Sequence, residues 1–223
     1  MRERANDPRA SNLSRDRLAG LPRRRLRAAR NVTKAVVEVV ELPDGPIVVK
    51  DLVLRPWPIR LLLGPVQLDR EALAYARLQN VAGVPRFLGR IDRSAIALEY
   101  VDGPDLGAIA PGRLAPAFFD DLERLLETVH GRGVAHGDLS RRDVLVDPAG
   151  RAYLVDYSTA LVVGPDADPL SRFLFAQMCR ADRRALAKMR RRFLPGSGVE
   201  IPERPGLYRL GSRLKRLFGR PRR

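Results

Sequence analysis

Residues 136–143 read His136-Gly-Asp-Leu-Ser-Arg-Arg-Asp143, a charged stretch that lies between two apolar runs. Eighteen residues after Asp138, another apolar run, Ala-Tyr-Leu-Val, ends in the acid Asp156. We expect these acids to follow short strands and to face a common cleft. Carboxylates in that position suit a divalent cation, because Mg²⁺ is usually held by one or two carboxylates together with phosphate oxygens. Each aspartate taken alone is also a common turn residue.

Further upstream, a lysine interrupts a strand-like run. Lys50 falls within the β-branched residues 47–53, and Glu71 lies in the helical pattern that follows them. A lysine buried in such a strand needs a negative partner, which Glu71 could supply. The alternative interpretation is an exposed lysine on an edge strand.

Around these residues, apolar spacing and turn residues predict a chain that begins with strands and ends mainly with helices. The turn near Asp102 is the natural hinge between two lobes, so we expect an α+β fold. The predicted strands are 32–41, 47–53, 86–91, 95–101, 144–146 and 152–155, and the predicted helices cover 68–78, 118–129 and, as one or two helices, 169–194.

Taken together, these segments resemble the protein-kinase-like superfamily. Val48-Val-Lys50 is similar to the strand that carries the phosphate-binding lysine, and Glu71 to its helix partner. Leu98-Glu-Tyr-Val101 is similar to the hinge, residues 136–143 to the catalytic loop, and Asp156-Tyr-Ser158 to the metal-binding triplet. His-Gly-Asp in place of His-Arg-Asp points to atypical small kinases: RIO-type kinases, lipopolysaccharide-core (Kdo/heptose) kinases and, more distantly, aminoglycoside phosphotransferases. The resemblance runs from about residue 31 to about residue 194.

The resemblance implies a two-lobed protein-kinase-like fold, with a small antiparallel-sheet N-lobe and a shortened, mainly helical C-lobe. The expected divisions are a basic flexible N-terminal tail over 1–27, the N-lobe over 28–101, the C-lobe over 102–195, and a basic C-terminal tail with an amphipathic helix over 196–223.

It also implies ATP and Mg²⁺ as cofactors and a hydroxyl-bearing acceptor. Lys50 would hold the α- and β-phosphates, oriented by Glu71, and Asp138 would accept the proton of the acceptor hydroxyl or orient it. The backbone at Glu99 and Val101 would bind adenine.

Three residues of the catalytic and metal-binding segments depart from the family pattern. Asp143 and Asp156 are the expected metal ligands, although Asp143 replaces an asparagine. The loop lysine is Ser140, which leaves Arg141 or Arg142 to neutralise the γ-phosphate. Ser158 replaces the glycine that closes the triplet, while His136 is best interpreted as structural support for the loop.

The phosphate loop and the substrate platform also differ from those of ordinary protein kinases. No glycine-rich motif precedes Lys50, so Thr33 and Lys34 would have to offer a hydroxyl and a charge to the phosphates. No Ala-Pro-Glu and no long activation segment follow Asp156, which argues against a conventional kinase of peptides.

Net charge concentrates at the two ends of the chain. Of the formal +15, residues 1–30 contribute +7 and residues 207–223 another +7, so the stretch between is nearly neutral. Such tails favour an anionic partner, either a membrane surface or nucleic acid, and the scarcity of aromatic residues makes nucleic acid the weaker candidate.

The C-terminal segment has the pattern of a basic amphipathic helix. Apolar residues recur at helical spacing between basic ones: Leu207, Leu210, Leu214, Leu217 and Phe218. The stretch 55–63, Arg-Pro-Trp-Pro-Ile-Arg-Leu-Leu-Leu, could add a second interfacial contact. The alternative to membrane binding is a helix docked on its own domain with solvated arginines.

Composition excludes several classes of protein. One cysteine, Cys179, excludes a disulfide framework and a multi-cysteine metal site. The apolar runs are too short to span a membrane, and no apolar segment follows the N-terminal arginines, so we expect a cytoplasmic protein that can lie on the inner membrane face.

Three functional hypotheses follow. The first is a kinase that phosphorylates a hydroxyl of a saccharide or glycolipid at the membrane surface. The second is a RIO-like serine/threonine protein kinase. The third is a pseudokinase that binds nucleotide or a partner without turnover.

Overall fold

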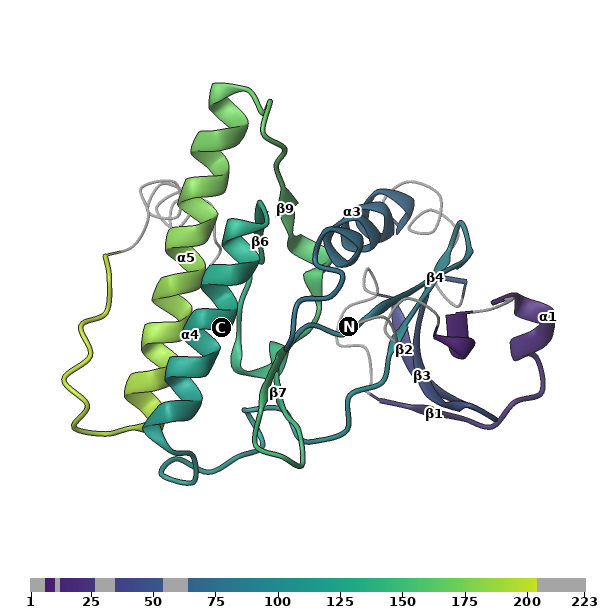
Figure 1. The fold of residues 1–223 in the computed structure, drawn as a ribbon, viewed down its shortest axis with the longest axis horizontal. Helices are drawn as coiled ribbons and strands as arrows, with labels where there is room; N and C mark the ends of the chain where they lie inside the picture. The colour runs from purple at the N-terminus through teal and green to yellow at the C-terminus, as the bar shows by residue number, and fades with distance from the viewer. Residues whose placement is uncertain (1–6, 11–12, 27–34, 54–63, 204–223) are drawn as a thin grey trace, which may run out of the picture.

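The computed structural model describes residues 7–10, 13–26, 35–53 and 64–203. An antiparallel sheet and a mainly helical part form two lobes (Figure 1), as expected for an α+β chain. The sheet has the order β1-β2-β3-β5-β4. Its strands are β1 (Arg23–Arg25), β2 (Val36–Leu42), β3 (Gly45–Asp51), β4 (Phe87–Asp92) and β5 (Ala95–Glu99).

The hairpin of β2 and β3 places Lys50 in the sheet. Leu42 pairs with Gly45 across a tight turn, and Gly45 has the positive φ of +108° that favours glycine. The register that follows sets Lys50 opposite Val37 on one side and Ile96 on the other. Lys50 therefore lies in a central strand, so the alternative of an exposed edge-strand lysine is wrong.

The N-terminal segment differs from the expected flexible tail. It contains the short helices η2 (Pro8–Ala10) and α1 (Arg15–Leu18), and β1 pairs with β2 through the backbone. Leu18 is buried, and Arg15 binds Asp51 at 2.7 Å and the Ser94 hydroxyl at 2.9 Å. The sheet therefore begins before the predicted boundary at residue 28, because ion pairs and one apolar anchor hold this segment.

Helix α3 (Gly64–Arg77) connects the two lobes. Its apolar face buries Leu68, Ala72 and Tyr75 in the main core, as the predicted spacing required. The helix contacts β4 and β5 on one side and, in the second lobe, η4 (Tyr157–Thr159) and β9 (Leu161–Val162) on the other. Residues on α3 can therefore reach the cleft between the lobes.

The second lobe is built on two long helices, α4 (Pro116–Gly131) and α5 (Pro169–Phe193). Beside them lie the short pairs β6 (Val134–Ala135) with β9 and β7 (Val144–Val146) with β8 (Ala152–Leu154), while η3 (Arg141–Asp143) precedes β7. Residues 169–193 form one helix, which begins where the Asp168 side chain accepts hydrogen bonds from the Leu170 and Ser171 amides at 3.0 Å.

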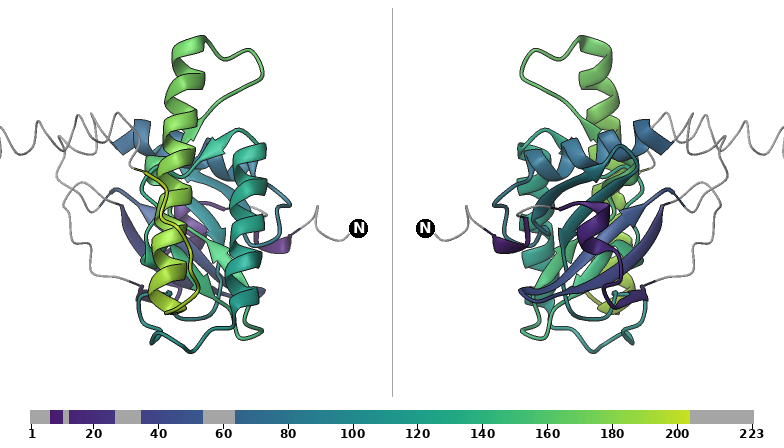
Figure 2. Two further views of the ribbon diagram at one scale, coloured as in Figure 1. Left: turned by 90° about the vertical axis from the view of Figure 1, so that its left-hand side faces the viewer. Right: turned by 90° about the vertical axis from the view of Figure 1, so that its right-hand side faces the viewer.

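The first turns of α5 stand clear of the rest of the molecule (Figures 1 and 2). After Phe193 the chain reverses, and residues 194–203, which we call the return segment, run beside α5 toward its N-terminal end. Within the described ranges, we find no helix that combines the length and apolar character needed to cross a membrane.

Candidate active site

The cleft between the lobes is organised around Lys50. Its ammonium is bonded to Glu71 of α3 and lies 3.2 Å from the carboxylate of Asp156, which follows β8. Lys50 and Glu71 are 7% and 2% exposed, so the ion pair is buried. Residues separated by up to 106 positions thus converge on one ammonium.

Burial and charge oppose each other in this cluster. Burial lowers the pKa of Lys50, but the carboxylates of Asp156 and Glu71 outweigh that effect and raise it well above its ordinary value. Burial raises the pKa of Glu71 although Lys50 acts in the other direction. The lysine therefore remains charged at neutral pH and can interact with an anionic ligand.

Asp156 is held in an unusual backbone conformation. Its φ and ψ are 69° and 63°, the left-handed region that non-glycine residues rarely adopt. Its amide donates to the hydroxyl of Tyr75 at 3.2 Å. Tyr75 packs edge-on against Tyr157, which in turn lies 5.2 Å from the His136 ring. A stack of rings thus links α3 to the loop that carries Asp138.

That loop is anchored from below by Asp182 of α5, which is 1% exposed. Its carboxylate accepts from the amides of His136 at 2.8 Å and Gly137 at 2.9 Å, and Nε2 of His130 lies at 3.1 Å. Three polar groups satisfy a carboxylate that would be costly to bury alone.

Gly137 is required at its position for steric reasons. It has a φ of +85°, and a Cβ there would lie 2.3 Å from Cε of Met178 and 2.9 Å from the carbonyl oxygen of Thr159. The Met178 side chain is flexible and could move, but an arginine would still have the strained φ and would press on the Thr159 backbone of η4. This contact explains why the loop reads His-Gly-Asp in this chain.

Asp143 is fixed by a reciprocal cap. Its carboxylate accepts from the amide and hydroxyl of Ser140 at 2.9 and 2.6 Å, and the Asp143 amide donates back to the Ser140 carbonyl at 3.0 Å. Burial raises the pKa of Asp143, and the charge of Asp156 adds to that effect while Ser140 and His136 oppose it. The carboxylates of Asp143 and Asp156 therefore face the same cleft. The hydrogen bonds to Asp143 do not fully offset the cost of burying its charge.

A cavity of about 780 Å³ occupies the cleft. Its walls combine an apolar part near the hinge with a polar part near Lys50. The apolar and hinge residues are Leu26, Ala35, Val37, Val48, Leu98, Glu99, Tyr100, Val101 and Leu145, and the polar residues include Lys50, Asp138, Ser140, Arg142, Asp143, Asp156 and Ser158.

The hinge is supported by the N-terminal segment. Arg24 of β1 lies over the ring of Tyr100 at 5.2 Å from its centroid and donates to the Tyr100 hydroxyl at 2.8 Å. The Glu99 carboxylate accepts from Arg86. Gly103 allows the chain to leave the hinge, because a Cβ there would lie 2.0 Å from the Val146 carbonyl oxygen.

Most residues predicted for the site meet in this cleft. Lys50, Glu99, Val101, Asp138, Asp143 and Asp156 line the cavity, and Glu71 lies behind Lys50 beside a smaller hollow. Of the two candidate arginines, Arg142 lines the cavity and Arg141 does not. The predicted phosphate contacts, Thr33 and Lys34, lie outside the described residues, as do 55–63 and 207–218.

Sequence reasoning missed Tyr75 as a partner of Asp156 and Asp182 as the anchor of the loop. A search for acids inside a helix about 45 residues after the segment 136–143 could have singled out Asp182. The role of Tyr75 gave no signal beyond its core spacing.

Comparisons with known proteins match the chain to kinases, although no family model matches it. A stretch of 101 residues is 37% identical to CBL-interacting protein kinase 16 of Oryza sativa subsp. japonica, covering 42% of this chain and 22% of that protein. A stretch of 66 residues is 30% identical to 3-deoxy-D-manno-octulosonic acid kinase of Xylella fastidiosa (strain M12), covering 29% of this chain and 26% of that protein. These curated relatives are thus matched over only about a quarter of their length.

Among solved structures, the Rio2 kinase from Chaetomium thermophilum superposes with a TM-score of 0.58 at 18% sequence identity. The match covers 76% of this chain and 57% of that chain, which establishes the fold. The chain has a protein-kinase-like fold and resembles the atypical kinases of that superfamily.

Proposed function

We propose that this protein is an ATP- and Mg²⁺-dependent phosphotransferase that phosphorylates a hydroxyl group. The observation that carries the proposal is the buried Lys50, bonded to Glu71 and Asp156 at the wall of a cavity that Asp138 and Asp143 also line. The matches to kinases support a phosphotransferase.

The cavity suits a nucleotide in both size and polarity. Val48, Leu98 and Leu145 provide apolar walls for a base, next to the backbone of Glu99 and Val101 at the hinge. A base placed there directs its phosphates toward the polar end of the cavity, where the charged Lys50 can bind them. The apolar and the cationic ends of the cavity thus correspond to the two ends of ATP.

The donor set fits Mg²⁺. Asp143 and Asp156 supply two carboxylates to the same cleft, and Asp143 lacks full compensation for its burial. Within the described ranges, three or more metal-ligating side chains do not cluster, so phosphate oxygens would complete the coordination. When bound, the ion would neutralise charge on the phosphate oxygens.

Asp138 is placed for the transfer step. It is exposed at the cavity, on a loop fixed by Asp182. As the acceptor oxygen bonds to the γ-phosphorus, the bond to the β,γ-bridging oxygen breaks and ADP leaves. The acceptor proton passes to the Asp138 carboxylate and then to solvent. Arg142 can offset the charge of the transferred group.

For the acceptor, we propose a hydroxyl of a saccharide or glycolipid at an anionic membrane surface. Only η4, β9 and a six-residue connection separate Asp156 from α5, which leaves a peptide without the platform of ordinary protein kinases. The likeness to 3-deoxy-D-manno-octulosonic acid kinase supports a sugar acceptor. The likeness to Rio2 kinase favours a RIO-like protein kinase as the second candidate.

The test begins with thermal unfolding in the presence of ATP, with and without Mg²⁺. A ligand that binds only the folded protein raises the midpoint temperature of unfolding. ATP should therefore raise this temperature for wild type in a Mg²⁺-dependent way, and Lys50→Met should abolish the increase. Lys188→Met, at an exposed position of α5, is the matched control and should keep the shift.

Turnover distinguishes an enzyme from a pseudokinase. Asp138→Asn should bind ATP normally and lose transfer of γ-phosphate to saccharide, glycolipid or protein acceptors, whereas Asp121→Asn on the outside of α4 should not. A wild-type protein that binds ATP but phosphorylates none of these acceptors would overturn the proposed activity and support the pseudokinase.

A further inference from the structure

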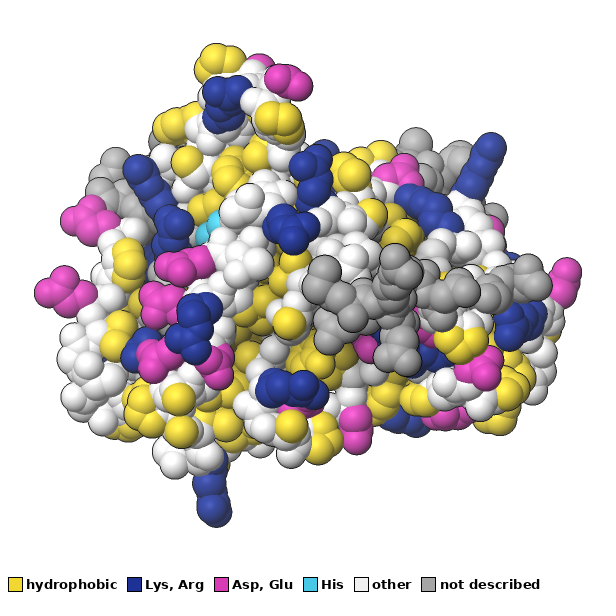
Figure 3. Space-filling model, in the orientation of Figure 1, with side chains coloured by type: hydrophobic (Ala, Val, Ile, Leu, Met, Phe, Trp, Pro, Cys, Tyr) yellow, Lys and Arg dark blue, Asp and Glu magenta, His cyan; other side chains and the backbone are white. Residues whose placement is uncertain are grey.

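Arg24 of β1 differs from most arginines of the N-terminal segment in the kind of partner that it contacts. Acidic and basic side chains are interspersed over the lobe that contains the sheet, on the face that Figure 3 shows. Four arginines of the segment form ion pairs with carboxylates: Arg9, Arg15, Arg23 and Arg25. Arg24 instead lies 5.2 Å from the ring centroid of Tyr100 in the hinge. The balance of surface charge does not explain this contact.

The register of β1 places Arg24 on the face of the sheet that forms a wall of the cavity. Arg24 pairs with Val39, which pairs in turn with Val48 of the cavity wall. Residues that pair directly share one face of a sheet, whereas neighbours along a strand point to opposite faces. Arg25 therefore lies on the other face, where it contacts Glu38.

Three contacts fix the side chain of Tyr100, which lines the cavity. Its ring lies under the Arg24 guanidinium, and its hydroxyl accepts from that group at 2.8 Å and donates to Asp102 at 3.0 Å. Leu26 follows Arg24 by two residues and also lines the cavity. A tyrosine side chain rotates about two torsions, so these contacts keep the ring at the cavity wall.

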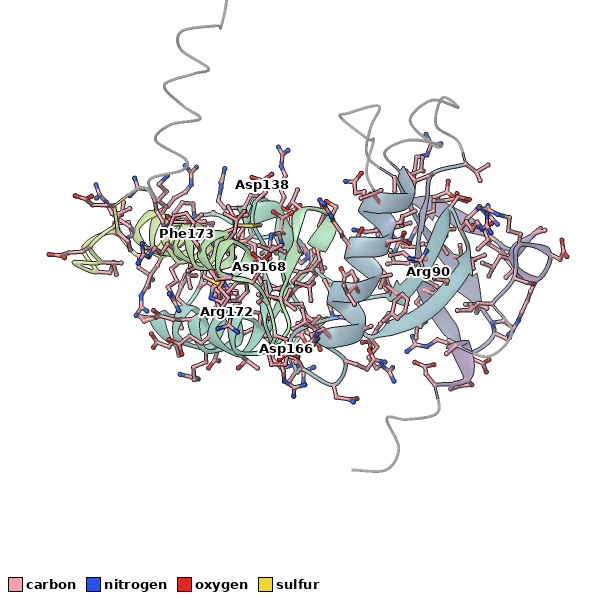
Figure 4. The ribbon with its side chains drawn as sticks, turned by 90° about the horizontal axis from the view of Figure 1, so that it is seen from above. Arg90, Asp138, Asp166, Asp168, Arg172 and Phe173 are labelled. Carbon is pink, nitrogen blue, oxygen red and sulfur yellow. The ribbon has the colours of Figure 1, made fainter. Side chains whose placement is uncertain are left out.

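Other groups hold the hinge backbone at this point. The Glu99 amide donates to the Arg86 carbonyl oxygen at 2.9 Å, and the Glu99 carboxylate accepts from the Arg86 amide at 3.0 Å. Asp138 belongs to the second lobe, and Figure 4 shows it across α3 from Arg90 of β4. A change in β1 that releases the Tyr100 ring should therefore leave both the hinge backbone and Asp138 in place.

We propose that Arg24 is a positioning residue for the nucleotide base. It holds Tyr100 at the hinge end of the cavity, so that this ring and Leu26 form walls for a base before the base binds. A wall that is already ordered loses less conformational freedom on binding, which raises affinity. The proposal rests on the proposed nucleotide site. Because the phosphates belong to the other end of the cavity, at Lys50, Arg24 should affect binding of the base alone.

The experiment is isothermal titration calorimetry of the full chain with three ligands: ATP with Mg²⁺, adenosine, and tripolyphosphate with Mg²⁺. In Arg24→Ala, the dissociation constants of ATP and adenosine should rise about fivefold, as expected for loss of one exposed cation–π contact and its hydrogen bond. The dissociation constant of tripolyphosphate should stay constant. Arg25→Ala is the matched control, because it removes the same charge from the next position of the strand, and it should bind all three ligands as wild type does.

A second pair of variants tests whether Arg24 acts through Tyr100. Tyr100→Ala removes the wall itself, so Arg24→Ala added to it should weaken ATP binding no further. A full fivefold loss in that background would overturn the proposal. Equal ATP affinities of Arg24→Ala and Arg25→Ala would overturn it as well, and so would an equal loss of affinity for tripolyphosphate.

Failure of the proposed function would look different. A wild-type protein that binds ATP but transfers no phosphate would refute the phosphotransferase, and the affinities of Arg24→Ala and Arg25→Ala would still decide the role of Arg24. A wild-type protein that binds neither ATP nor adenosine would refute both proposals.

Discussion

Two buried carboxylates in this protein have nearly the same exposure and opposite settings. Asp182, at the base of the loop that carries Asp138, is 1% exposed and accepts from two backbone amides, with the His130 imidazole nearby. Glu71, in the cleft, is 2% exposed and is bonded to one ammonium, that of Lys50. The hydrogen-bond donors to Asp182 include two backbone amides, which the fold holds in place. Glu71 instead depends on the ammonium of Lys50, which an anionic ligand could also bind.

The comparison teaches where stability and activity separate. Removing an acceptor from backbone donors leaves amides unpaired in the interior, which is a cost to folding. Changing the partner of Lys50 alters the position and charge of a group that would bind phosphate. We therefore expect mutations at Asp182 to act mainly on stability and mutations at Glu71 mainly on turnover.

The largest effect is expected for Asp182→Ala. It leaves two amides and an imidazole without their acceptor, so the free energy of unfolding should fall by about 3–5 kcal/mol. Urea unfolding measures this change. Asp182→Asn keeps one oxygen and should cost less; an unchanged midpoint in both variants would contradict the anchoring role.

Glu71→Gln tests the opposite expectation, that a change at Glu71 affects turnover more than stability. The amide keeps the shape and one acceptor, so stability should change by only about 1 kcal/mol. Turnover should fall about 100-fold, because Lys50 loses the charge that orients it. Steady-state kinetics with ATP tests this; loss of stability without loss of turnover would reverse the assignment of the two regions.

A smaller effect is expected for Tyr75→Phe, which keeps the ring stack and removes one hydroxyl. The Asp156 amide loses its acceptor, at a cost of about 1 kcal/mol. If the hydroxyl positions Asp156, the Mg²⁺ concentration for half-maximal rate should rise while the KM for the acceptor stays constant. Tyr153→Phe on β8 is the control, and equal Mg²⁺ dependence in both variants would exclude a positioning role.

The smallest effect concerns pH. The pKa of Lys50 is raised in the folded protein, so its contribution to stability is fully present below its ordinary value of 10.5 and is lost as pH rises through the higher folded value. The stability difference between wild type and Lys50→Met should therefore be constant from neutral pH to about 9.5 and shrink above 10.5. A difference that already declines near pH 8 would show that the lysine is not held charged.

The sequence predicted those parts of the molecule that are marked by the spacing of residues within one short segment. Lys50, Glu71 and Asp156 stand in segments with recognisable spacing, and the strand over 144–146 was predicted with its observed bounds. Asp182 was not found because its neighbours are charged and its partners lie 45 and 46 residues away. Only the packing of α5 against the loop reveals its role.

In the N-terminal segment, sequence analysis missed a whole strand, β1, rather than the role of one residue. Arg23, Arg24 and Arg25 have the composition of a solvated charge run, yet they form β1. Their side chains are all exposed; the backbone pairs with β2, and Arg23 and Arg25 add ion pairs with Glu38 of that strand. Binary patterning predicts strands from buried side chains, so a strand with none of them gives no pattern.

β1 also forms one margin of the five-stranded sheet, where unpaired backbone groups could recruit a strand from another molecule. Three consecutive arginines at this margin place like charges on any two copies that approach edge to edge. The same residues that conceal the strand from sequence analysis therefore protect the sheet from aggregation, and the protein should remain dispersed at concentrations where a neutral edge would polymerise.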